Sequence, residues 1–401
     1  MRGIYSLVFV ALCVFVKAQG EANFSFLGNG FDANWKPHSL KVISSATANS
    51  NGVNTGMYND FLFREGFRKE MTDAFKANKS EQLNFYSRAE INFEYKLSKK
   101  WGVALNYQNE AAYTSSKQLF DMLLFGNADY QGTNITSDKL SFLRYTKAGF
   151  DATYLLSSSE KVVSKLSAGF FGLYNYSQAG SGSLSIFTAP RGEYIDISSS
   201  NFFLADRSND LLQGLGLNLG YDVNYTWNRN NTLSFAAQDV NVTRMFNHSR
   251  VYLDTSFRFS GLQYDVFGDT TSLESYVDSN YLSVIRNGRK DIGWITLPSR
   301  INLQWTNKLN CRTNLIVGLE AIDLGRFGVS GWFGLDHEFS DKFRLLSTLG
   351  YGNFSGVVWS EAAEYRFNRV SLYTRLQSLH SLIIPENTTN YGASIGISSN
   401  F

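Results

Sequence analysis

The chain has 401 residues, of which 15% are aromatic and 18% charged, and its formal net charge is +2. This balanced charge, without a basic cluster interleaved with aromatic residues, excludes a nucleic-acid partner. No run beyond the N-terminus approaches the about 18 apolar residues of a transmembrane helix, which excludes a helical membrane protein.

Residues 1–18 are predicted to be a secretory signal peptide. Met1 and Arg2 precede an apolar run from Ile4 to Val16, and cleavage after Ala18 satisfies the small-x-small rule. The mature chain then keeps only Cys311, so no intramolecular disulfide framework is expected. Residues 19–39 show no regular alternation of apolar and polar residues and are expected to form an N-terminal segment that plugs the lumen of a barrel. The barrel itself is expected to span residues 40–401.

The first elements of the predicted barrel are a weak strand over 40–49 and a helix over 56–77, broken at Gly66. From Leu83 onward apolar and polar residues alternate, with a break only at Tyr86-Ser87. A period of two with one apolar and one polar face predicts β-strands between two different media. Six hairpins with short turns are expected: 83–97 with 101–108, 144–156 with 162–176, 211–227 with 233–235, 298–305 with 315–319, 327–339 with 343–351, and 357–367 with 370–376.

The connections between these hairpins are mostly longer, the longest being 110–142, 177–210 and 243–296. Short turns at one end and long loops at the other are typical of an outer-membrane barrel, with the short turns periplasmic. Residues 251–259 also alternate, but a membrane-spanning strand there would reverse the direction in which every later strand crosses the membrane. We therefore place them within an extracellular connection.

The C-terminal strand alternates from Tyr391 to Phe401 and is long enough to cross a bilayer at a tilt. Its apolar face and final aromatic residue resemble the targeting signal that outer-membrane assembly machinery reads. The residues that carry this signal are Tyr391, Ile395, Ile397 and Phe401. Pairing of this strand with 40–49 gives the predicted fold: all-β, a transmembrane antiparallel barrel of about 14 strands with short helices in its extracellular loops.

Two carboxylates interrupt the lipid-facing pattern. Simple alternation points Asp239 and Glu361 into lipid, which costs a few kcal/mol, so we predict β-bulges at Gln238-Asp239 and Ala362-Ala363 that turn both inward. Such bulges either adjust the register locally or open a lateral route from lumen to membrane. The predicted lumen charges, which either pack as ion pairs or line a channel, are Arg88, Glu90, Glu94, Arg144, Asp222, Asp239, Glu320, Asp336, Glu361, Arg366 and Arg375.

Four stretches resemble a family of Bacteroidetes-type outer-membrane barrels of unknown function, which is similar in architecture to the fatty-acid transporter FadL and the secretion protein PorV. They are Leu119 to Asn127, Gly214 to Gly220, Leu297 to Arg300, and Leu379 to Pro385. The chain has Asn34-Trp35-Lys36-Pro37 where that family has Asn-Pro. The resemblance implies a barrel but supplies no catalytic or ligand residues.

No enzyme or cofactor site is predicted, because the four histidines are isolated and lack metal-ligand spacing. The leading hypothesis is a monomeric outer-membrane barrel that binds or passes a small hydrophobic molecule through a loop-lined mouth. The alternative is a scaffold or cargo-binding partner in a secretion complex, with a diffusion porin third. The aromatic loop residues are either ligand contacts or packing of loops onto the rim: Phe61, Phe63, Phe67, Phe120, Phe125, Phe202 and Phe203.

Overall fold

The computed structural model describes residues 38–54, 56–57, 60, 69–180, 182–205, 210–246, 248–259, 289–291, 293–323, 327–352, 355–379 and 388–400. The predicted signal peptide, nearly all of the predicted N-terminal segment, and Phe61, Phe63 and Phe67 lie outside these residues. Among the described helices, none is long and apolar enough to cross a membrane.

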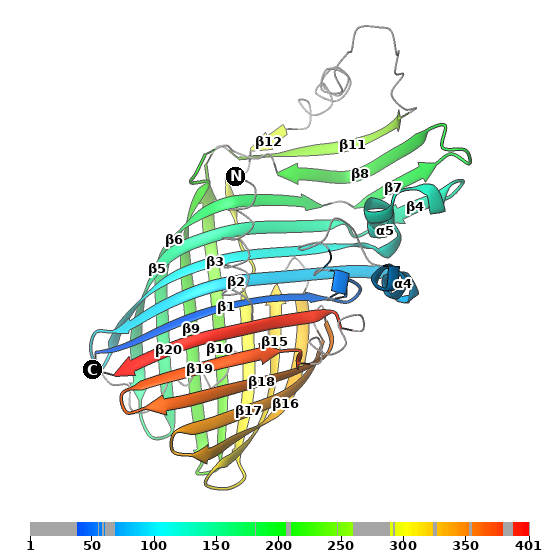
Figure 1. Cartoon of the computed structure of the whole chain (residues 1–401). Coiled ribbons are helices and arrows are strands. Elements are labelled where there is room, and N and C mark those ends of the chain that lie inside the picture. The colour runs from blue at the N-terminus through cyan, green and yellow to red at the C-terminus, as the bar shows by residue number, and fades with distance from the viewer. Residues whose placement is uncertain are drawn as a thin grey trace, which may run out of the picture.

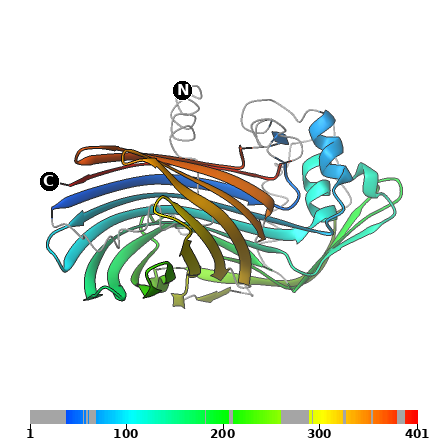
Figure 2. The same ribbon diagram turned by 90° about the horizontal axis from the view of Figure 1, so that it is seen from below.

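Fourteen antiparallel strands form a closed ring (Figures 1 and 2). Their order is β1 (Ser39–Ser50), β2 (Gln82–Lys96), β3 (Trp101–Ser116), β5 (Ser141–Ser158), β6 (Val162–Gly180), β9 (Gly214–Asn228), β10 (Asn231–Met245), β14 (Arg300–Lys308), β15 (Thr313–Asp323), β16 (Phe327–Ser340), β17 (Phe343–Gly352), β18 (Ser355–Phe367), β19 (Val370–Gln377) and β20 (Asn390–Asn400). Strand β20 pairs with β1 over Ser39 to Asn49, which closes the ring and removes the sheet edges. The predicted barrel of 14 strands is confirmed.

The outward face of the ring is apolar. Exposed outward side chains include Phe93, Leu217, Phe333 and the Ile395 and Ile397 pair of the C-terminal strand. Exposed apolar residues that alternate with polar inward residues around a closed barrel are the pattern of a lipid-facing wall. Phe401 lies outside the described residues, so the last position of the predicted targeting strand stays a prediction.

The long connections gather at one end of the barrel, called here the long-loop end, and the hairpin turns at the other, the short-turn end (Figure 1). The long-loop end carries β4 (Asn134–Ser137), β7 (Ser183–Thr188), β8 (Ile195–Ala205), β11 (Ser249–Phe259), β12 (Arg289–Asp291), β13 (Trp294–Ile295), α4 (Lys69–Ala77), α5 (Lys117–Phe125) and the 3-10 helix η1 (Ala128–Tyr130). Strand β11 pairs with β8 and β12 outside the ring. The prediction that 251–259 does not span is therefore confirmed.

Helices α4 and α5 pack together at the long-loop end through Phe75, which is fully buried. The rings of Phe120 and Phe125 lie 5.9 and 6.0 Å from that of Phe75. The Lys76 ammonium donates to Asp129 at 2.8 Å, and this hydrogen bond raises the pKa of Lys76. Two of the predicted ligand aromatics, Phe120 and Phe125, thus pack between helices.

Inward aromatic rings lie over glycines of the neighbouring strand. Phe171 lies opposite Gly216, Trp332 opposite Gly318, and Tyr373 opposite Gly396. A Cβ at any of these glycines would clash with the ring of its partner. The glycines therefore provide the space in which bulky residues fill the interior.

Candidate functional site

A cluster of buried charged and polar side chains crosses the lumen. We call it the septum and define it as Tyr86, Arg88, Glu110, Lys147, Asp239, Arg300 and Glu320. Arg300 on β14 donates to the Tyr86 hydroxyl on β2. Going round the ring from β2 to β14, five strands lie between them in one direction and seven in the other. Side chains from two distant walls thus meet inside the barrel.

Ion pairs hold the septum together. Arg300 lies 3.6 Å from Glu110 and 3.2 Å from Glu320, and the side chains of all three are at most 4% exposed. Arg88 lies 3.5 Å from Asp239, whose other oxygen is 2.6 Å from the Lys147 ammonium. Removing one partner from buried pairs of this kind leaves an uncompensated buried charge, so loss of any one member is unfavourable.

A second feature, called here the apolar wall, lies inside the barrel toward the long-loop end. It consists of Tyr145, Phe171, Leu173, Tyr176, Met245, Ile295 and Leu297 from β5, β6, β10 and the chain that follows β12. All seven are buried, Tyr145 and Leu173 completely. Inward positions of a water-filled barrel are normally polar, so this wall departs from the pattern of a diffusion pore.

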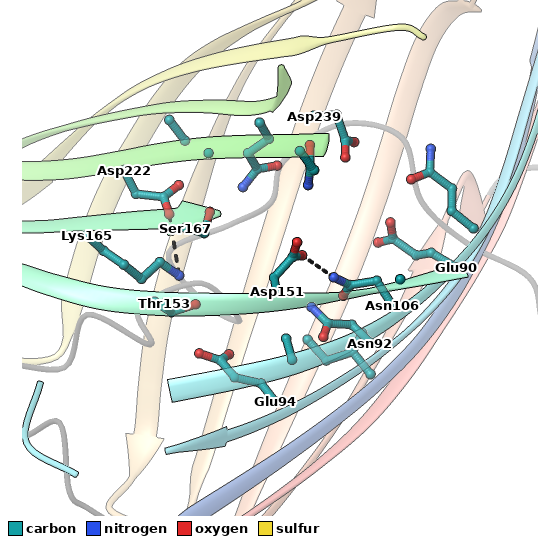
Figure 3. A pocket seen from close by; sticks show the side chains of 18 of the residues that line it. Glu90, Asn92, Glu94, Asn106, Asp151, Thr153, Lys165, Ser167, Asp222 and Asp239 are labelled. Carbon is teal, nitrogen blue, oxygen red and sulfur yellow. Dashed lines mark hydrogen bonds and ion pairs between the residues drawn. The ribbon is translucent and has the colours of Figure 1, made fainter. Parts of the chain in front are cut away.

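A cavity of about 280 Å³ lies on the short-turn side of the septum. Its lining includes Asn106, Asp151, Asp222 and Lys165, with Phe171 of the apolar wall at its boundary. Figure 3 shows Lys165 directed at Asp222 and Asn106 at Asp151. We call it the polar cavity.

One of the two predicted bulges is present. The β9–β10 register shifts between Ala237 and Val240, and Asp239 adopts a φ of 58° there. This extra residue turns Asp239 into the lumen and leaves Val240 and Val242 exposed outward. The prediction of a bulge at Gln238-Asp239 is confirmed.

The second predicted bulge, at Ala362-Ala363, is wrong. The β17–β18 register is continuous from Tyr351 to Phe343, so Ala362 faces inward and Glu361 faces the lipid side, opposite Ser347. The Glu361 carboxylate accepts hydrogen bonds from Ser347 Oγ at 2.6 Å and Trp359 Nε1 at 2.7 Å. These two donors replace part of the hydration that the carboxylate loses beside lipid. Glu361 was predicted to face the lumen, and that assignment is wrong.

Replacing Glu361 with leucine is expected to stabilise the barrel by about 1–3 kcal/mol, because a lipid-facing carboxylate stays costly despite its two hydrogen bonds. Urea unfolding in lipid vesicles would measure this change. Glu364→Leu is the matched control, since Glu364 faces inward and binds Arg366 at 2.9 Å. Loss of stability in Glu361→Leu would contradict the lipid-facing assignment.

Arg144 also differs from its assignment. It is exposed and pairs with Ala111, on the face of β5 opposite to Tyr145 and Lys147, so it does not line the lumen. The other predicted lumen charges lie on the inward face, distributed from the septum to the short-turn end: Arg88, Glu90, Glu94, Asp222, Asp239, Glu320, Asp336, Arg366 and Arg375. Phe202 and Phe203 lie on β8, outside the ring, where Phe203 contacts Tyr252 and Arg250.

Several residues of the site were not predicted from the sequence: Tyr86, Glu110, Lys147, Asp151, Arg300 and Asn302. The break in alternation at Tyr86-Ser87 was a usable signal, because it marks an aromatic side chain on the polar face. Lys147 and Asp151 occupy alternate positions with Tyr145 on β5, so the period places the three on one face. It did not identify that face as the inward one, because Arg144 on the other face was assigned to the lumen.

The fold and the site define a transmembrane β-barrel whose lumen is crossed by ion-paired side chains. No family model matches the chain, and no curated protein matches it. Similar solved structures include a FadL homologue of Pseudomonas aeruginosa (10% identity, TM-score 0.45, covering 91% of this chain and 90% of that one) and the toluene transporter TbuX of Ralstonia pickettii (8%, 0.42, 91% and 90%). The translocator domain of the autotransporter NalP of Neisseria meningitidis is another (10%, 0.36, 94% and 92%). At these identities the likeness is one of barrel architecture.

Proposed function

We propose that this protein is an outer-membrane barrel that binds a small hydrophobic molecule entering from its extracellular, long-loop end and passes it across the membrane. The observation that carries the proposal is the apolar wall, because seven buried apolar side chains line the inside of the barrel where a diffusion pore is polar. A hydrophobic ligand that inserts among these side chains gains free energy by leaving water.

The septum supports the same proposal. It places charged groups from distant strands in contact across the lumen, which opposes free diffusion of hydrated solutes along the axis. The proposed barrel is therefore selective, and its ligand binds on the long-loop side of the septum before any further movement.

A fluorescent apolar probe, N-phenyl-1-naphthylamine, tests this function with the purified protein in nanodiscs, with empty nanodiscs as the blank. We expect saturable binding at one site. Leu173→Gln should weaken it about 10-fold, because an amide without a partner then lies in the wall. Leu211→Gln is the matched control, since Leu211 is 86% exposed at the long-loop end.

Two results would overturn the proposal. One is binding that equals the empty-nanodisc blank. The other is binding that Leu173→Gln and Leu211→Gln leave equally unchanged while both variants remain folded.

A further inference from the structure

We propose that the polar cavity binds a protonated amine carried by the hydrophobic molecule, with the Asp151 carboxylate as its counter-ion. This inference rests on the proposed function, because it names the head group of the same ligand. Its starting point is the balance of charges around the cavity.

The cavity is lined by five carboxylates and four cationic groups: Glu90, Glu94, Asp151, Asp222 and Asp239, with Lys41, Arg88, Lys147 and Lys165. Three of the cations pair with other carboxylates, Arg88 with Glu90, Lys147 with Asp239, and Lys165 with Asp222. Among the described residues, no cation lies within 4.0 Å of Asp151. The cavity therefore holds one carboxylate in excess.

The carboxylate of Asp151 is held in place and open to the cavity. Asn106 Nδ2 donates to it from β3 (Figure 3). On its other side, Asp151 lies opposite Gly169, where a Cβ would clash with the carboxylate. Glycine at this position thus leaves the space that the acidic group occupies.

Two amide oxygens that accept no hydrogen bond from the described residues also line the cavity. Asn302 is 8% exposed and lines the cavity, and neither its Oδ1 nor its Nδ2 has a hydrogen-bond partner in the described part of the chain. Asn218 on β9, which pairs with Gly169 on β6, hydrogen-bonds to Asp151, and its Oδ1 has no partner among the described residues. An ammonium group has three donors and no acceptor, so one carboxylate and two amide oxygens suit it.

Phe171 connects this acceptor group to the apolar wall. It pairs with Gly149, two residues before Asp151, so both side chains lie on the inward face of neighbouring strands. At about 30 Å³ per water molecule, a cavity of about 280 Å³ has room for roughly nine waters, or for a compound of similar size. A molecule that has moved past the septum from the apolar wall into the cavity keeps its apolar body against Phe171 while its amine reaches the acceptor group.

Three ligands with the same phenyl body test the proposal: 2-phenylethylamine, 2-phenylethanol and 3-phenylpropionate. Calorimetry with the full chain in nanodiscs at neutral pH would compare them. We expect the amine to bind at least about 10-fold more tightly than the alcohol, because a hydrogen bond between charged groups is stronger than a neutral one. The carboxylate should bind most weakly.

The Asp151→Asn variant keeps the shape and removes the charge. It should reduce amine binding to about the level of the alcohol and change alcohol binding much less than amine binding. Asp341→Asn, in an exposed short turn, is the matched control. If Asp151→Asn does not fold, as judged by its heat-dependent migration in gels, Asn302→Leu provides a second test, with amine binding several-fold weaker.

The outcomes are distinguishable. Equal binding of amine and alcohol, tightest binding of the carboxylate, or amine binding that Asp151→Asn leaves intact would each overturn the amine site while leaving a hydrophobic ligand in place. Failure of all three ligands together with the apolar probe would overturn the proposed function itself.

Discussion

Arg300→Ala is expected to convert a non-conducting barrel into an ion-conducting one. Arg300 bonds to Tyr86 and Glu110 from across the lumen, and to Glu320 on the neighbouring strand β15. Its removal leaves two carboxylates, at most 2% exposed, without this cation, and breaking buried pairs of this kind costs about 3–5 kcal/mol. Water and counter-ions should then enter to solvate the carboxylates, which opens the septum.

Planar-bilayer recording and urea unfolding measure the two parts of this prediction separately. The wild type should show no unitary conductance, and Arg300→Ala should show discrete cation-preferring openings. Arg300→Met retains most of the side-chain volume without its charge, so it should lose stability while conducting less than the alanine variant. Arg258→Ala is the control, because Arg258 pairs with Asp196 on the exposed long-loop strands. Porin-like conductance in the wild type would contradict a lumen blocked by the septum.

The septum also shows where sequence reasoning stops. Alternation identifies each strand and which of its faces is inward, because the period of two is local. It cannot show that Arg300 meets Tyr86, 214 positions earlier, because that contact depends on how the closed ring brings distant walls together. The barrel was therefore predictable, and the pairing of its interior charges was not.

The two predicted bulges differ for a physical reason. Asp239 and Glu361 break the same rule, and a bulge was expected at each. Asp239 has a lysine and an arginine within reach inside the barrel, so an inward turn is stabilised. Glu361 instead has Trp359 and Ser347 as donors on the outer face, and its strand keeps a regular register. Hydrogen-bond donors on neighbouring strands decide whether the carboxylate turns inward at a bulge or stays on the outer face. The sequence of one strand does not show where those donors lie.

Gly318→Val is expected to destabilise the barrel and lower its folded fraction. The Trp332 indole lies over Gly318, and a Cβ there would overlap its ring. Trp332 belongs to one buried cluster with Ile316, Leu346 and Tyr373, so its displacement would disturb the packing of that cluster. Overpacking of a tight interior costs about 1–3 kcal/mol, occasionally more.

Heat-dependent gel migration after refolding into vesicles measures the folded fraction, and the urea midpoint gives the change in the free energy of unfolding. The control is Gly356→Val, because no described residue lies within 4 Å of a Cβ at Gly356. The double variant Gly318→Val with Trp332→Ala should recover folding, since the smaller residue vacates the space. If Gly318→Val folds as well as Gly356→Val, the glycine is not needed as space for the indole. Because Trp332 also lines the polar cavity, the double variant should enlarge that cavity, which links the packing of the wall to the volume available for a ligand.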